Sequence, residues 1–144
     1  VRLRRTHPVF RQRAFFLGRP VGTGGVKDLA WFTPSGNEMS VSDWLSRAAR
    51  TIGMYLSGQG IRTRDARGEP ITDDSFLLVL HAGDNEVDFV LPGSPWARAY
   101  ELVLDTATTG GAAAGTSPQA GAPLRAGAAL HRLPRSLAVL RVLP

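Results

Sequence analysis

Asp73 and Asp74 form an adjacent pair of carboxylates, and two carboxyl groups are the chemical requirement for hydrolysing a glycosidic bond. In that reaction the two groups face one another across the scissile bond, about 5–9.5 Å apart. Neighbouring side chains on one chain reach such a geometry only through an unusual backbone conformation. We therefore predict that the pair lies in a turn or at the solvated start of a strand, and we assign no catalytic residue.

The three histidines, His7, His81 and His131, stand alone, without the spacing of a histidine or carboxylate metal site. His81 ends an apolar run and is predicted to be a packed or edge residue, whereas the other two are predicted to be exposed. The chain has no cysteine, which excludes disulfides, thiolate metal sites and a cysteine nucleophile. The Gly-Thr-Gly-Gly segment at 22–25 lacks the spacing of a phosphate-binding loop. We predict no metal and no cofactor.

Three tryptophans could serve as platforms for sugar, because an exposed indole can stack on a pyranose ring. Trp31 lies in an apolar run, which favours a place in the core. Trp44 opens a short predicted helix and is expected to be half-buried, and Trp96 follows Gly-Ser-Pro in a loop. These residues leave open an alternative function, a carbohydrate-binding β module that holds branched glucan through Trp96 or Trp44.

The formal net charge of +5 is distributed unevenly along the 144 residues. Residues 1–20 carry +6, residues 21–105 carry −5 and residues 106–144 carry +4. No aromatic residues interleave the arginines in an RNA-binding pattern, so we predict no nucleic-acid partner. The apolar runs are shorter than the ~20 residues of a membrane-spanning helix, which predicts no membrane partner. The opening residues lack the apolar segment of a signal peptide, which favours a cytoplasmic protein.

Helical elements are predicted mainly near the beginning of the chain. Residues 1–13 have the pattern of the end of an amphipathic helix, with apolar side chains among arginines. A short strand is predicted at 29–33. A short helix is predicted from about 43 to 50, capped by Ser42 or Asp43.

From residue 51 onward, strand-length runs are bounded by Gly, Pro, Asp or Asn. The runs are 51–58, 74–82, 86–93, 99–105 and 136–143. Their spacing predicts an antiparallel β-sandwich, so the fold class is mainly β. We expect an Asp84-Asn85 turn to join the second and third runs in a hairpin. The low-complexity segment 107–123 is predicted to be a flexible surface loop between the last two strands.

Alternation within the runs predicts which side chains are buried. Tyr100, Leu102 and Leu104 should share one face of their strand, because successive side chains point to opposite sides. The run 76–80 is apolar on both faces and is therefore predicted to lie at the centre of a sheet, buried on both sides.

Six blocks of the sequence carry a resemblance to a known family. They are LRRTHPVFRQRAFFLGRP, GGVKDLAWFTPSGNEMSVSDW, ARTIGMYLSGQGI, DDSFLLVLHAGDNEVDFVLPG, WARAYELVLDTA and RLPRSLAVLRVL. They resemble the C-terminal end of bacterial glycogen debranching enzymes, which are isoamylase-type members of the α-amylase superfamily. The stretches KDLAWFTPSGNEMSVSDW and DDSFLLVLHA are the most specific, and the resemblance covers nearly the whole chain except residues 107–129.

The resemblance implies that residues 51–144 are the family's C-terminal β-sandwich domain. It implies that residues 1–50 are the last helix and connecting segment of a (β/α)8 barrel that is missing here. The parent would hydrolyse α-1,6 branch linkages in glycogen or limit dextrin, with a catalytic Asp and Glu on the barrel. No block here resembles the motifs around those residues, so this piece is expected to be structural and inactive alone. Its partners would be the missing barrel and, through the parent enzyme, branched α-glucan.

Overall fold

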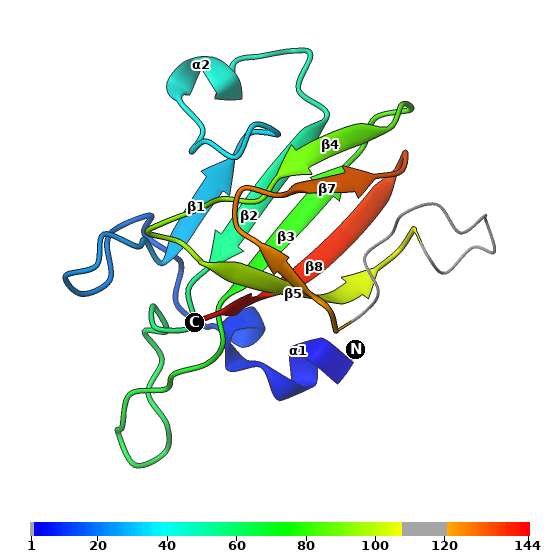
Figure 1. Ribbon diagram of the computed structural model, residues 1–144. Helices are drawn as coiled ribbons and strands as arrows, with labels where there is room; N and C mark the ends of the chain where they lie inside the picture. The colour runs from blue at the N-terminus through cyan, green and yellow to red at the C-terminus, as the bar shows by residue number, and fades with distance from the viewer. Residues whose placement is uncertain (1, 108–120) are drawn as a thin grey trace.

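The computed structural model describes residues 2–107 and 121–144, and all structural statements below refer to those residues (Figure 1). Most of the predicted flexible loop at 107–123 lies outside them, so that prediction stays a prediction. The helices and strands are α1 (Arg2–Thr6), the 3-10 helix η1 (Pro8–Arg11), β1 (Leu29–Phe32), α2 (Val41–Trp44), β2 (Thr51–Leu56), β3 (Phe76–His81), β4 (Val87–Val90), β5 (Ala99–Asp105), β6 (Pro123–Arg125), β7 (Ala129–Arg132) and β8 (Ser136–Leu143).

The strands pair in antiparallel fashion and form two sheets. The larger sheet has the strand order β1-β2-β3-β8-β5-β6, and β4 pairs with β7 in a second sheet. In Figure 1 the β4–β7 pair lies across one face of the larger sheet. This arrangement confirms the predicted antiparallel β-sandwich. It also confirms the central position predicted for 76–80, since β3 lies between β2 and β8. The predicted burial on both sides is wrong for Leu80, which is 40% exposed.

A continuous apolar core fills the space between the two sheets. Phe89 of β4 and Leu130 of β7 belong to one buried cluster with Tyr100 and Leu140 of the larger sheet. Gly53 of β2 allows Phe89 to approach closely, because a Cβ on this glycine would lie only 2.5 Å from the phenylalanine Cζ. Full burial of a large apolar side chain contributes about 1.5–3 kcal/mol. The inner face is therefore what holds the sandwich together.

Two predictions about the strands were wrong. β3 and β4 do not form the hairpin predicted around Asp84-Asn85, because both edges of β3 are already paired, one with β2 and one with β8. The chain after β3 therefore crosses to the second sheet. Leu104 does not share the buried face of Tyr100 and Leu102. A β-bulge between Leu102 and Leu104 shifts the register, and Leu104 is 40% exposed.

The helical segments are shorter than the sequence indicated. The helix predicted at 1–13 is the short α1 followed by the 3-10 helix η1. The helix predicted at 43–50 is the single turn α2, and its N-cap is Ser40. The Ser40 hydroxyl accepts a hydrogen bond from the Asp43 N–H, and the Asp43 carboxylate accepts one from the Ser40 N–H. β6 and β7 are strands that the sequence analysis did not predict.

Gly58, just after β2, is a position where even a methyl group should be costly. A Cβ there would lie 2.0 Å from the Asp73 carbonyl oxygen, and the backbone cannot move away cheaply because the Gly58 carbonyl accepts the Asp73 N–H at 3.0 Å. We expect Gly58→Ala to lower the free energy of unfolding by about 1–3 kcal/mol, measured by chemical denaturation. Gly24→Ala is the matched control, since its Cβ would meet nothing within 4 Å. Equal stabilities of the two variants would contradict this prediction.

Candidate functional site

The face of the larger sheet that points away from β4 and β7 is lined by apolar side chains, and we call it the outer face. Strand alternation and register place these residues on it: Leu29, Trp31, Ile52, Met54, Leu56, Phe76, Leu78, Leu80, Leu137 and Val139. A sheet face open to water ordinarily carries polar side chains. The composition of the outer face therefore indicates a surface that another layer covers.

Residues 2–11, with α1 and η1, form that layer over one end of the outer face, and we call them the N-terminal segment. Val9 of η1 is 1% exposed and packs in a buried cluster with Leu56, Phe76 and Val139. The ring centroid of Phe10 lies 4.8 Å from that of Phe76. Figure 1 shows α1 at the same end of the sheet. This end is a second small core, separate from the one between the sheets.

The other end of the outer face has no comparable cover among the described residues. Ile52, Leu78 and Leu137 are only partly buried, and Leu80 is 40% exposed. These residues sit side by side, because Ile52 pairs with Leu80 and Leu80 pairs with Leu137. Contiguous exposed apolar surface of this kind marks interaction sites. We call these four residues the uncovered strip.

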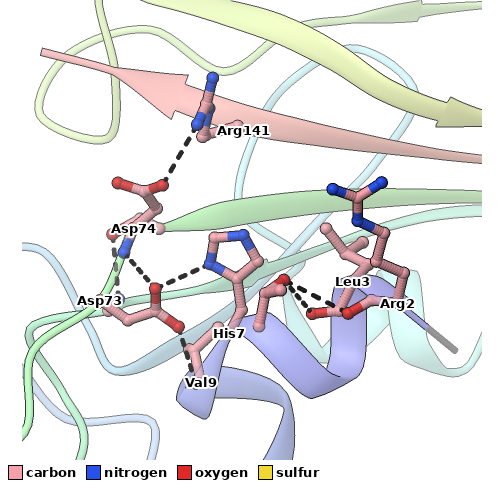
Figure 2. A network of polar contacts seen from close by, with 10 residues as sticks. Arg2, Leu3, His7, Val9, Asp73, Asp74 and Arg141 are labelled. Atoms are coloured by element: carbon pink, nitrogen blue, oxygen red, sulfur yellow. Dashed lines mark hydrogen bonds and ion pairs between the residues drawn. The ribbon is translucent and has the colours of Figure 1, made fainter.

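A polar junction fixes the N-terminal segment to the sheet (Figure 2). His7 Nδ1 lies 2.8 Å from Oδ1 of Asp73, and the Val9 N–H donates to Oδ2 at 3.0 Å. The Asp74 N–H donates to the same carboxylate at 2.8 Å. The Asp73 side chain is 8% exposed. The prediction of a solvated pair is therefore wrong for Asp73, which anchors a segment more than sixty residues away.

The two adjacent carboxylates do not face each other across an open site. Figure 2 shows that Asp74 turns toward Arg141, 3.5 Å away, and Arg141 also pairs with Glu101. His7, Asp73 and Asp74 do bring three potential metal-ligand atoms within 4.8 Å of one another. The Asp73 carboxylate, however, already has three hydrogen-bonding partners, with which an ion would have to compete. We interpret the group as a structural junction.

The histidines occupy three different environments. His81 is buried as predicted and borders a hollow of about 600 Å³, but its Nδ1 lies 2.8 Å from the Thr51 hydroxyl and its Nε2 contacts a backbone carbonyl. Both nitrogens are thus engaged. The predicted exposure of His7 is wrong, because its side chain is 19% exposed. The His131 side chain is 39% exposed, and a hydrogen bond to Asp88 raises the pKa of this histidine.

Of the three tryptophans, Trp44 is half-buried as predicted, whereas Trp31 does not lie in the core. Trp96 packs against the main core, with its ring edge-to-face on Phe32 at 5.1 Å and on Tyr55 at 5.2 Å between centroids. Trp31, expected in the core, lies on the outer face and is only partly buried. Its ring meets that of Trp44 edge-to-face at 5.5 Å, and Trp44 is 51% exposed. Trp31 and Trp44 therefore form an accessible aromatic pair, which sequence spacing did not reveal.

Residues 28–141 match the protein family described as isoamylase, C-terminal. The chain belongs to this family. Proteins named glycogen operon protein GlgX homolog, from Mycobacterium bovis and Mycobacterium tuberculosis, are 47% identical to it over 105 residues. The matched residues are 72% of this chain and 15% of each relative. The chain thus corresponds to a small part of the length of the relatives it matches.

The isoamylase C-terminal region begins at Asp28, and this residue ties the preceding segment to the sheet. Its carboxylate accepts hydrogen bonds from the Leu17 N–H at 2.8 Å and the Arg19 N–H at 3.1 Å. The region includes β1, which pairs with β2 along four residues. β1 therefore belongs to the sheet, although it lies before residue 51, at which we placed the start of the β domain.

In the part of the chain that the structure describes, no helix has the length and apolar character to cross a membrane.

Proposed function

We propose that this chain is the C-terminal β domain of a glycogen debranching enzyme, and that its role is to pack against the catalytic barrel and stabilise it. The parent enzyme hydrolyses α-1,6 branch linkages of glycogen or limit dextrin, and the domain alone is inactive. In this proposal the segment before the sheet is the end of the barrel, and the enzyme works in the cytoplasm. Family membership and the short share of the relatives that the chain matches support it.

The uncovered strip is the main observation that supports the proposed structural role. The N-terminal segment covers one end of the outer face and leaves Ile52, Leu78, Leu80 and Leu137 beside it partly open. If the N-terminal segment is the end of the barrel, the rest of the barrel would lie next to this segment and therefore next to the strip. Burial of apolar area there would contribute about 25 cal/mol per Å².

The carboxylates of the chain favour a structural role over catalysis. Asp73 is occupied by the junction with the N-terminal segment, and Asp105 is held by two hydrogen bonds from Arg132. Glu101 is paired with Arg141. A retaining glycosidase needs two carboxyl groups that flank the substrate bond about 5–5.5 Å apart. These three carboxylates are therefore already engaged in contacts that stabilise the fold.

The test compares this chain with a longer protein that includes the upstream coding region. We expect release of glucose chains from glycogen limit dextrin by the longer protein and none by the 144-residue chain. Turnover by the chain above a buffer blank would overturn the proposal that it is inactive alone. Lack of turnover by the longer protein would overturn the proposed enzyme activity.

The docking role has its own test. Leu80→Asp should destabilise the 144-residue chain less than the longer protein, because Leu80 is already 40% exposed in the chain alone. In the longer protein it should lower the thermal stability of the barrel, because it places a charge in the interface. Val41→Asp is the matched control, since Val41 is 77% exposed, lies on α2 and is not part of the strip. Equal effects of the two variants on the longer protein would contradict docking through the strip.

A further inference from the structure

A small hollow lies between β1, at the edge of the larger sheet, and α2. Its volume is about 150 Å³, and both indoles of the Trp31–Trp44 pair line it. The charged side chains in its wall are Lys27 and Glu38. The hollow thus combines two aromatic rings with one cationic and one anionic group.

The protein holds this hollow in shape without a ligand. The Met39 N–H donates to the Trp31 carbonyl at 2.8 Å, which fixes the segment leading into α2 against β1. Reciprocal hydrogen bonds between Ser40 and Asp43 then fix the first turn of α2, which carries Trp44. Ordering such groups before binding reduces the entropy that binding must overcome. The two rings are therefore placed in advance.

The charges of the hollow suit a neutral ligand. Lys27 and Glu38 form an ion pair, so the wall offers hydrogen-bond donors and acceptors side by side with no net charge. Because the two charges offset each other, neither an anion nor a cation gains a net electrostatic attraction. Trp44, which is 51% exposed, offers an apolar platform. A ring with an apolar face and hydroxyl groups on its edge satisfies both features.

We propose that the Trp31–Trp44 hollow binds a glucose unit of an α-glucan chain. The choice of α-glucan among sugars rests on the proposed function. Of the two positions that the sequence left open, the site contains Trp44, here together with Trp31. It does not contain Trp96, which is packed on the core. Binding here would give this domain its own contact with the polymer.

The test is electrophoresis of the 144-residue chain under non-denaturing conditions in gels with and without glycogen. The chain runs toward the cathode because its net charge is +5. We expect glycogen to retard it, and Trp44→Ala to weaken the apparent affinity about tenfold or more. Dextran at the same mass concentration controls for sieving by a polymer. Leu45→Ala controls for general apolar contact, since Leu45 follows Trp44 and is 77% exposed.

Equal migration in glycogen and dextran would overturn the site. Equal loss of retardation in the two variants would also overturn it, because the effect would then not depend on the Trp44 ring. Debranching by the longer wild-type protein is a separate readout. If debranching is intact and the chain does not bind glycogen, the site fails and the proposed function stands. If the chain binds glycogen and the longer protein does not debranch, the proposed function fails while the binding result stands.

Discussion

Arg132→Met should lower the free energy of unfolding by about 3–5 kcal/mol, the largest single-site loss that we expect in this chain. The side chains of Arg132 and Asp105 are 1% and 4% exposed. Two parallel hydrogen bonds of 2.8 and 2.7 Å join the guanidinium to the carboxylate. Methionine would leave the Asp105 carboxylate buried without this guanidinium. Chemical denaturation followed by circular dichroism measures the loss.

Two further variants separate the ion pair from general packing. Asp84→Asn breaks the ion pair between Asp84 and Arg135, in which the two side chains are 75% and 77% exposed. This change should lower the free energy of unfolding by only about 0.2–1 kcal/mol. The double variant Arg132→Met with Asp105→Leu should regain most of the loss, because it leaves no buried charge. Among the described residues the buried Arg132 Nε has no hydrogen-bond partner, so the native pair is itself not fully satisfied. A double variant as unstable as Arg132→Met would contradict this explanation.

The same pair gives the stability a dependence on acid. Burial alone would raise the pKa of Asp105, but hydrogen bonds from Arg132 and from the Ala107 N–H outweigh burial and hold the pKa below its ordinary value. A carboxylate with a lowered pKa in the folded state stabilises the protein above the ordinary pKa of about 3.9. This contribution is lost as the pH falls through the lowered value. Wild type should therefore lose stability below about pH 4 more steeply than the double variant, whereas parallel curves would contradict the assignment.

The positions of several strands could be predicted because their signals are local. The apolar run 76–80 lies within the predicted strand 74–82, and β3 spans Phe76–His81. β5 and β8 occupy the predicted ranges, Ala99–Asp105 and Ser136–Leu143. Within one strand, successive side chains point to opposite faces, so apolar residues recur at every second position. This pattern does not depend on the strand's partners and can be read from a single sequence.

Pairing and polar contacts could not be predicted because they depend on partners far along the chain. β4 pairs with β7 instead of β3, and no local signal distinguishes these partners. Asp105 meets Arg132 across 27 residues, and Asp73 meets His7 across 66. Each of these side chains looks like an ordinary surface charge in the sequence. Their burial follows only from the sandwich that brings the partners together.

Asp73→Ala should release the N-terminal segment from the outer face. It removes the acceptor for the His7 ring, the Val9 N–H and the Asp74 N–H, and the first two of these groups belong to that segment. We expect a loss of about 2–4 kcal/mol, since a hydrogen bond to a charged group contributes about 1.5–3 kcal/mol. Hydrogen exchange at residues 2–11 should become faster, while the strands of the main sheet stay protected.

Asp74→Ala provides the control, because the neighbouring carboxylate has the same chemistry in a different setting. The Asp74 side chain is 46% exposed and lies 3.5 Å from Arg141, so its removal should cost less than about 1 kcal/mol. If both variants lost the same stability, the junction would not be the anchor. If residues 2–11 stayed as protected in Asp73→Ala as in wild type, the apolar contacts of Val9 and Phe10 would be sufficient to hold the segment. The comparison therefore decides whether a polar lock or the small apolar core fixes the end of the chain that we propose leads to the barrel.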